Sequence, residues 1–396
     1  MKKIFFGLTG GLGPILRSLP IANYYQQAGM EVFFSMYDEK NSKLVERSGY
    51  KVLIDDDPTM PDPQYTIPAS PLFLNLDQYY AQSGFLDVDF TRSWVLSRIK
   101  MLKDNMIDLV FADLSPHTVI AARYLGIPVV SILQSCFHPQ GEKLIPLEYY
   151  PDNLPTVTPV FNTILKELKL NTVSKMEELL SGNIDIIPSI PELDPVQHKN
   201  AKYVGPIEID VQTGHNEEMT KERTILVYPG RLKDTSGDSG VRLIQTIVDG
   251  FRGKEELVYI ATDEEIPSEI AYKIQWSKNL KIIPHYSSKL LKSSDLFIHH
   301  GGHGSCLSSI TNKVPSLVIP THSERFFNAR KVKEVGVGEY LLMNTFTPDL
   351  LYNKAKDIMN NLDFKLNLLQ LNETIETRGY TGAYQVFKLS RSLINL

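Results

Sequence analysis

A short apolar run that breaks into three glycines is the feature that most constrains the fold of this chain. Leu296–Ile298 are apolar, Gly301, Gly302 and Gly304 follow, and apolar residues then recur at helical spacing from Cys306. Glycine lets a backbone approach a ligand closely, and the first N–H groups of a helix have no partner inside it. The pattern therefore predicts a strand, a turn and a helix whose N-terminus suits an anion such as phosphate.

The same alternation of strands and helices runs through both halves of the 396 residues, which are too many for one ordinary core. We predict an α/β protein with two doubly wound, Rossmann-like lobes and a cleft between them. The expected parts are an N-terminal lobe at 1–206, a linker at 207–222, a C-terminal lobe at 223–380 and a last helix at 381–396 that packs back on the first lobe.

Two segments of the first half depart from this alternation. Residues 55–89 are rich in proline and aromatic residues without a regular pattern, which is typical both of a binding loop and of a disordered linker. The aromatic residues from Tyr65 to Phe85 could pack under a loop or line an acceptor pocket. Residues 183–187 and 202–204 are expected to be edge strands.

Composition narrows the function classes. The net charge of −5 gives no reason to expect nucleic acid, and no run of about 20 apolar residues could span a bilayer, which leaves peripheral membrane contact open. Cys136 and Cys306 are the two cysteines and lie far apart in the sequence, so we expect a reducing, cytoplasmic location.

Polar residues follow two predicted strands of the first half, where a parallel sheet binds ligands. Asp113 and His117 follow the strand at 109–112, and Gln134 and His138 follow the strand at 129–133. Asp113, His117 and His138 are candidate general bases. Each has a structural alternative: a helix cap or turn for Asp113, and a packed or exposed side chain for the histidines.

The second half contains four short segments in a fixed order: His300–Ser305, Val314–Pro315, Glu324–Arg325 and Asn328–Ala329. The first half contains a glycine-rich stretch at Gly10–Ala22. Together these segments resemble a known family: the two-lobed, inverting nucleotide-sugar glycosyltransferases of the GT-B fold, in the group of the bacterial antibiotic (macrolide-type) glucosyltransferases and the UDP-glycosyltransferases.

The resemblance implies that the second lobe binds the sugar donor and the first lobe binds the acceptor. The implied sugar-donor residues are His300, Gly301, Gly302, Gly304, Ser305, Glu324, Arg325, Asn328, His285 and Gly230. Gly11, Gly13, Arg17 and Gln134 would lie on the acceptor side. No cofactor is expected besides the co-substrate, a UDP- or TDP-sugar. No metal is expected either, because Gly301 and Gly302 make a turn between His299–His300 and His303, so these histidines do not share one helical face.

Two positions depart from the family pattern. Arg325 stands where relatives have glutamine, and it carries a fixed charge and a rigid fork of N–H groups. Pro14 stands where relatives have the histidine that acts as general base, and proline cannot take a proton. Either another group accepts the proton, or the acceptor needs little help to lose it, or the chain does not transfer sugar.

The sequence therefore predicts an inverting, metal-independent glycosyltransferase that moves a sugar to a hydroxyl of a small or lipid-like acceptor. Two alternatives keep the fold. One is a catalytically silent relative that regulates an active transferase, which Pro14 suggests. The other is a nucleotide-sugar epimerase or hydrolase, in which no acceptor other than water takes part.

Overall fold

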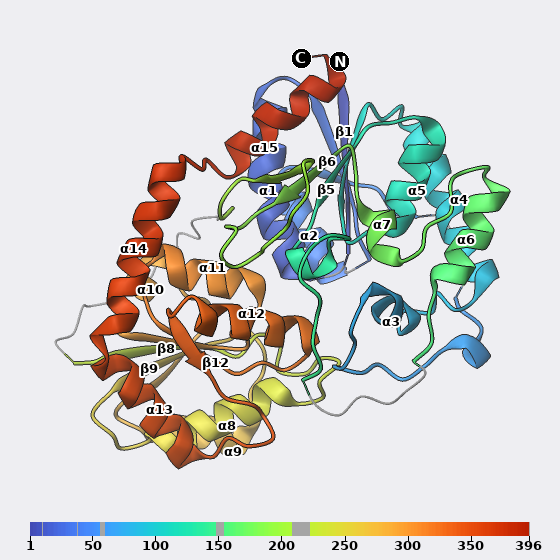
Figure 1. Ribbon diagram of the computed structural model, residues 1–396. Coiled ribbons are helices and arrows are strands. Elements are labelled where there is room, and N and C mark those ends of the chain that lie inside the picture. The colour runs from blue at the N-terminus through green and yellow to red at the C-terminus, as the bar shows by residue number, and fades with distance from the viewer. Residues whose placement is uncertain (10, 38, 56–59, 148–153, 208–221, 396) are drawn as a thin grey trace. The chain divides into compact units, whose positions relative to one another are not determined.

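The chain forms two compact units, shown in a computed structural model that describes residues 1–9, 11–37, 39–55, 60–147, 154–207 and 222–395 (Figure 1). Unit 1 comprises Met1–Ala69, Phe73–Ile209 and Tyr380–Leu396, and unit 2 comprises Ser70–Leu72 and Asp210–Gly379. Most of the expected linker at 207–222 lies outside the described residues.

Unit 1 is built on a seven-stranded parallel sheet of order β3-β2-β1-β4-β5-β6-β7. Its strands are β1 (Lys3–Leu8), β2 (Glu31–Ser35), β3 (Lys51–Val52), β4 (Leu109–Asp113), β5 (Val129–Ile132), β6 (Ile184–Ile187) and β7 (Ala201–Tyr203). The order runs outward in both directions from β1 and β4, so these strands form the switch point of a doubly wound sheet. The prediction that 183–187 is an edge strand was wrong, because β6 pairs on both sides with β5 and β7.

Helices cover both faces of this sheet. They are α1 (Leu12–Gln27), α2 (Glu39–Arg47), α3 (Leu76–Ala81), α4 (Val88–Asp104), α5 (Pro116–Leu125), α6 (Thr158–Glu167), α7 (Met176–Leu180) and α15 (Ala383–Ser390). Successive residues of a strand point to opposite faces. Phe6 accordingly joins the core under α1 and α15, whereas Phe5 lies under the guanidinium of Arg98 from α4.

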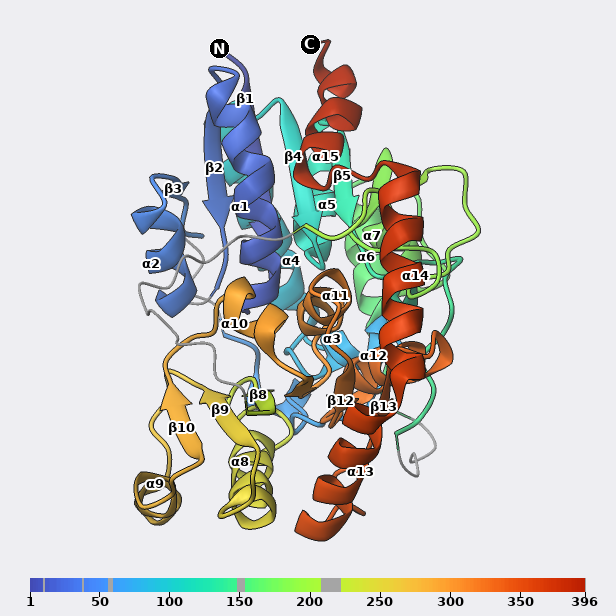
Figure 2. The same cartoon turned by 90° about the vertical axis from the view of Figure 1, so that its left-hand side faces the viewer.

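The last helix of the chain belongs to unit 1. Helix α15 contacts α1, and its Val386 lies in the same apolar core as Ile15 and Phe111. Figure 2 shows the two helices side by side over β1, β4 and β5. The Tyr25 hydroxyl also bonds to the Ser390 hydroxyl at 2.6 Å, so the C-terminal segment completes this face of the first sheet.

Unit 2 holds a six-stranded parallel sheet of order β10-β9-β8-β11-β12-β13. Its strands are β8 (Thr224–Tyr228), β9 (Leu257–Ala261), β10 (Leu280–Ile283), β11 (Leu296–His299), β12 (Ser316–Val318) and β13 (Gly338–Tyr340). Its helices are α8 (Ser239–Phe251), α9 (Ser268–Gln275), α10 (Ser288–Ser293), α11 (His303–Thr311), α12 (Ser323–Glu334), α13 (Pro348–Asn360) and α14 (Leu362–Arg378). Here β8 and β11 form the switch point, so the glycine turn lies where such a sheet binds ligands.

The proline-rich segment at 55–89 is more regular than its sequence indicates. It contains the helix α3, whose first turn is capped by the Asn75 side chain, and α4 begins at Val88. Its aromatic residues pack together: Phe85 contacts Tyr80, Phe90, Trp94 and Phe161 through their rings. These contacts favour the packing alternative over an open aromatic pocket.

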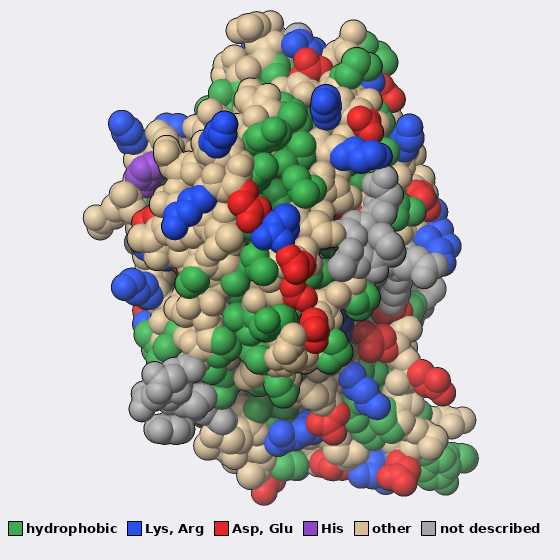
Figure 3. All heavy atoms as spheres, turned by 90° about the vertical axis from the view of Figure 1, so that its right-hand side faces the viewer, with side chains coloured by type: hydrophobic (Ala, Val, Ile, Leu, Met, Phe, Trp, Pro, Cys, Tyr) green, Lys and Arg blue, Asp and Glu red, His purple; other side chains and the backbone are tan. Residues whose placement is uncertain are grey.

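Two surface observations bear on the expected partners. Of the helices in the described ranges, none has the length and apolar character to cross a membrane. On the face drawn in Figure 3, described acidic and basic side chains are interspersed.

Candidate functional site

The glycine turn after β11 meets the loop after β8 at one side chain, His300. Gly230 follows β8 with a positive φ of 74°, and a Cβ atom there would lie 2.9 Å from the His300 ring. A Cβ atom at Gly302 would lie 2.7 Å from Nε2 of the same ring. Both glycines are therefore required by the packing of His300 at the switch point.

His300 combines burial with an unused nitrogen. The residue is 8% exposed, and its Nδ1 has no hydrogen-bond partner among the described residues. Burial, aided by the charge of Arg325, holds the pKa of His300 well below its ordinary value. The ring is therefore neutral near pH 7, and it can offer a single N–H to an anion.

The neighbouring His299 has a different role, because both of its ring nitrogens are engaged. Nδ1 accepts the Gly301 N–H at 3.2 Å, so the ring proton is on Nε2, which lies 3.0 Å from the Ser316 hydroxyl. Ser316 in turn donates to Ser309 at 2.7 Å. Burial lowers the pKa of His299 to about 3. His299 thus fixes the turn, and its ring offers no free nitrogen to a metal.

The start of α11 is open on the side where an anion would approach. Gly302 is its N-cap and no side chain caps the first N–H groups. A Cβ atom at Gly304 would meet nothing within 4 Å, whereas Ser305 is buried in the first turn. The helix N-terminus and the nitrogen of His300 together form a place for a phosphate.

The three predicted residues of α12, which are Glu324, Arg325 and Asn328, make hydrogen bonds to the glycine turn, to each other or to neighbouring loops. Asn328 Nδ2 donates to the Gly301 carbonyl at 2.9 Å and to Glu324 Oε1 at 2.7 Å. Arg325 Nη1 lies 2.9 Å from Asp234 Oδ2 in the loop after β8 and also donates to the Thr321 hydroxyl. Asn328 is therefore a support for the turn, and Arg325 is part of an ion pair that the sequence did not predict.

His285, the remaining sugar-donor candidate, is exposed in the loop after β10. Next to it, Tyr286 packs edge-on against Tyr228 at 5.5 Å between ring centroids, and Tyr228 packs edge-on against His300 at 5.3 Å. Aromatic rings thus extend from the glycine turn along the C-terminal edge of the sheet toward His285, and they suit a flat nucleobase.

In unit 1, the acceptor-side candidates gather at the other switch point. Gly11 follows β1 with a φ of 114° and is the N-cap of α1, and a Cβ atom at Gly13 would lie 3.9 Å from Arg17 Nη1. Arg17 Nε and Nη2 donate to the two carboxylate oxygens of Asp113 at 2.5 and 2.7 Å. Gln134 follows the adjacent strand β5 and is buried.

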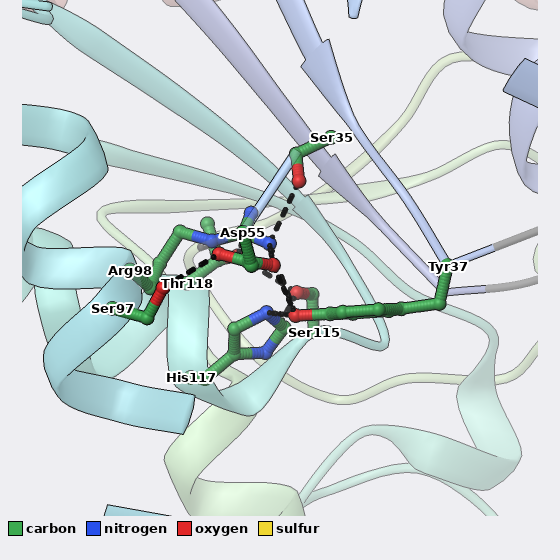
Figure 4. Close-up of polar contacts among 8 residues, drawn as sticks. All are labelled: Ser35, Tyr37, Asp55, Ser97, Arg98, Ser115, His117 and Thr118. Carbon is green, nitrogen blue, oxygen red and sulfur yellow. Dashed lines mark hydrogen bonds and ion pairs between the residues drawn. The ribbon is translucent and has the colours of Figure 1, made fainter. Parts of the chain in front are cut away.

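The candidate base His117 lies inside a buried polar network around Arg98, which the sequence did not predict (Figure 4). His117 Nε2 lies 2.9 Å from the Tyr37 hydroxyl, and Nδ1 lies 3.2 Å from the Ser115 hydroxyl. Arg98 bonds to Asp55 at 2.9 Å. Burial and then the Arg98 charge hold the pKa of His117 well below its ordinary value. His117 is thus a hydrogen-bonded member of the core.

The third candidate base, His138, belongs to a group that could hold a metal ion. The ligand atoms of His138, Asp185 and His198 lie within 4.8 Å of one another, and His138 Nε2 is 3.2 Å from Asp185 Oδ2. However, His138 Nδ1 accepts the Gln140 N–H at 3.1 Å, so the proton of the neutral ring is on Nε2. A ring that donates through Nε2 to a carboxylate has no lone pair there for a metal.

The three candidate bases therefore lie in three separate hydrogen-bonded groups, each with its own partners: Arg17 for Asp113, Tyr37 and Ser115 for His117, and Asp185 for His138. The donor-side candidates after β8, β11 and β12, by contrast, are joined by described contacts around His300 and Gly301.

Two doubly wound parallel sheets, each with ligand-binding features at its own switch point, define a two-lobed α/β protein of the GT-B architecture. Solved structures share this fold. The chain aligns over 100% of its length with 98% of the calicheamicin glycosyltransferase CalG4, at a TM-score of 0.75 and 15% identity. A second solved structure, of the glycosyltransferase VinC in complex with DTDP, aligns with 99% of this chain over 99% of its own length, at a TM-score of 0.71 and 16% identity.

Sequence relatives give the same class. Residues 266–378 match the family described as erythromycin biosynthesis protein CIII-like, C-terminal domain. An uncharacterized glycosyltransferase of Methanosarcina mazei is 22% identical over 92% of both chains, and the NDP-glycosyltransferase YjiC of Bacillus subtilis is 23% identical over 71% of both. The chain is a glycosyltransferase of the GT-B type, which confirms the predicted fold class and the resemblance.

Proposed function

We propose that this chain is an inverting, metal-independent transferase that moves a sugar from a UDP- or TDP-sugar to a hydroxyl of a small or lipid-like acceptor. The observation that supports this most is the turn after β11, where the buried, unpartnered Nδ1 of His300 lies beside the uncapped start of α11. A leaving diphosphate gains negative charge in the transition state. Helix N–H groups and a neutral imidazole N–H can stabilise that charge.

In this proposal the sugar is displaced in one step, and Asp113 accepts the proton of the acceptor hydroxyl. Of the three candidates, His117 and His138 have both ring nitrogens in hydrogen bonds. Each oxygen of Asp113 accepts one N–H from Arg17 and keeps a second lone pair. Because a carboxylate is ordinarily a weaker base than an imidazole, the acceptors that suit Asp113 best are acidic hydroxyls such as phenols.

Thermal unfolding with UDP, TDP and GDP, each with and without a chelator, tests the sugar-donor site. A ligand at 100 times its dissociation constant stabilises the native protein by about 2.7 kcal/mol. We expect a chelator-insensitive shift with UDP or TDP that is lost in His300→Ala. No shift with any nucleotide, or a shift that the chelator removes, would contradict the proposal.

A silent, donor-binding relative is the second candidate, and one observation favours it. Pro14 replaces the family histidine, and Arg17 occupies both oxygens of the nearby Asp113. A nucleotide-induced shift without transfer to any of a panel of phenols and alcohols would support this reading. Product formation, or release of free sugar that depends on Asp113, would exclude it.

A further inference from the structure

A polar contact spans the sugar-donor edge of unit 2, from the loop after β8 to the loop after β12. Residues 234–237 form a tight turn, in which the N–H groups of Asp234 and Gly237 each bond to the carbonyl of the other at 3.0 Å. The Ser236 hydroxyl donates to the Thr321 carbonyl at 2.7 Å, and Asp234 binds Arg325. Because β11 lies between β8 and β12 in the sheet, these bonds cross the edge at the glycine turn.

Arg325 lies directly beside the glycine turn after β11. A Cβ atom at Gly301 would lie 3.0 Å from the Arg325 carbonyl and 3.2 Å from its Cβ atom. The charge of Arg325 is felt by His300, since it contributes to the lowered pKa of that ring. A fixed cation therefore stands next to the place for a phosphate.

The charge of this cation is compensated by one carboxylate. The side chains of Arg325 and Asp234 are 14% and 9% exposed, so the pair is only slightly screened by water. Both described bonds of the guanidinium use Nη1, and Nε and Nη2 make no hydrogen bond to the described residues. Asp234 Oδ1 separately accepts the Ser236 N–H at 2.7 Å, which fixes the carboxylate in the turn.

We propose that Asp234 is an internal counter-anion that competes with an anionic group of the bound sugar donor for Arg325. The inference rests on the proposed function, because the anion is a part of the nucleotide sugar: its diphosphate or a carboxylate on the sugar. A donor anion that reaches Arg325 must displace the Asp234 carboxylate or share the guanidinium with it, and Asp234 thereby weakens the affinity for the donor.

Charge removal at Asp234 tests this directly. Asp234→Asn keeps the Oδ1 oxygen for the Ser236 N–H, and it replaces the charged Oδ2 that accepts from Arg325 with a neutral NH2 group. We expect the dissociation constant for UDP or TDP, measured by calorimetry, to fall about tenfold, which corresponds to about 1.4 kcal/mol. Asp238→Asn is the matched control. Asp238 lies in the same loop, its side chain is exposed, and it makes no ion pair with the described residues. It should change the constant less than about twofold.

A double-mutant cycle shows whether Asp234 acts through Arg325. Arg325→Gln should weaken nucleotide binding about tenfold, and Asp234→Asn should have no further effect in that background. Unfolding midpoints of all variants in the absence of ligand verify that they fold. Weaker binding by Asp234→Asn, unchanged binding of every nucleotide and nucleotide sugar tested, or equal tightening with and without Arg325, would overturn the proposal.

Three ligands identify the source of the anion. Equal tightening of inorganic pyrophosphate and UDP-glucose by Asp234→Asn would assign it to the diphosphate, and tightening confined to UDP-glucuronate would assign it to the sugar carboxylate. If no nucleotide binds the native protein but pyrophosphate binds Asp234→Asn more tightly, the proposed function fails and the role of Asp234 stands. If none of the ligands distinguishes the variant from the native protein, the role of Asp234 is wrong.

Discussion

Replacing Gly304 with alanine separates ligand binding at α11 from the stability of the helix. Gly304 lies in the first turn of α11, and a Cβ atom there would enter open space. Alanine is favoured over glycine in a helix by roughly 0.5–1 kcal/mol. For a unit of this size, that raises the unfolding midpoint by roughly 1–4 °C. The added methyl group would, however, occupy the space above the N–H groups that are proposed to hold the diphosphate.

The assay is thermal unfolding with and without UDP or TDP. At 100 times the dissociation constant, nucleotide stabilises the native protein by about 2.7 kcal/mol, or roughly 5–10 °C. Gly304→Ala should keep or exceed the native midpoint without ligand and lose most of the ligand-induced shift. A variant with the full native shift would show that no phosphate lies above Gly304, and our reasoning about the turn would be wrong.

Gly302→Ala is the matched comparison, because its methyl group would lie 2.7 Å from His300 Nε2 and force that ring to move. Overpacking of this kind costs about 1–3 kcal/mol. The midpoint should therefore fall even without nucleotide. The two alanine variants lose the ligand shift for different reasons, and only Gly302→Ala loses stability.

Three further predictions concern buried charge and the proton acceptor. His299 is neutral in the folded protein with a pKa of about 3, whereas its unfolded value is about 6.5, so its contribution is complete above pH 6.5 and is lost as the pH falls toward 3. In urea unfolding, the free energy of unfolding should fall between pH 7.5 and 5.5 by about 1.4 kcal/mol more in the native protein than in His299→Asn, since the other buried histidines lose stability in both. An equal fall in the two proteins would contradict the assignment. Arg98→Met leaves Asp55 as a buried, unpaired carboxylate and should cost about 3–5 kcal/mol in urea unfolding, most of which Asp55→Asn recovers in the double variant; additive losses would refute the pairing. Asp113→Asn should lower kcat by about 10²- to 10⁴-fold with little change in nucleotide affinity, and an unchanged kcat would exclude Asp113 as the base.

The strands were predictable where an apolar run ends at a glycine or a polar turn. Strands β1 (Lys3–Leu8) and β9 (Leu257–Ala261) are short, almost continuous apolar runs buried on two faces, which is the pattern expected of strands inside a parallel sheet. Helix α3 was missed because the prolines around it dominate the local pattern, although Asn75 is a suitable N-cap. Strand β13 has only three residues, too few for any periodicity.

Features of the site were predictable to the extent that they are local in the sequence. The turn at His300–Gly304 is one continuous segment, so its glycine spacing indicates both the backbone and the possible ligand. The pairs Asp234–Arg325 and Asp55–Arg98 join residues far apart in the chain, and each forms only when a loop that follows a strand meets a helix from a later part of the chain. Nothing in the local pattern around Asp234 indicates which cation it will face.

Pro14 and Arg17 both lie in the first part of α1. Pro14 is the third residue of α1, where a backbone N–H has no partner inside the helix, so proline causes no loss of hydrogen bonding there. Arg17 stands three residues further on, on the same side of the helix, and binds both oxygens of Asp113. Arg17 carries a fixed charge, so it cannot take a proton from the acceptor as an imidazole could. If Asp113 is the base, as proposed, the rates should rise as the pKa of the acceptor hydroxyl falls, because a carboxylate is ordinarily a weaker base than an imidazole.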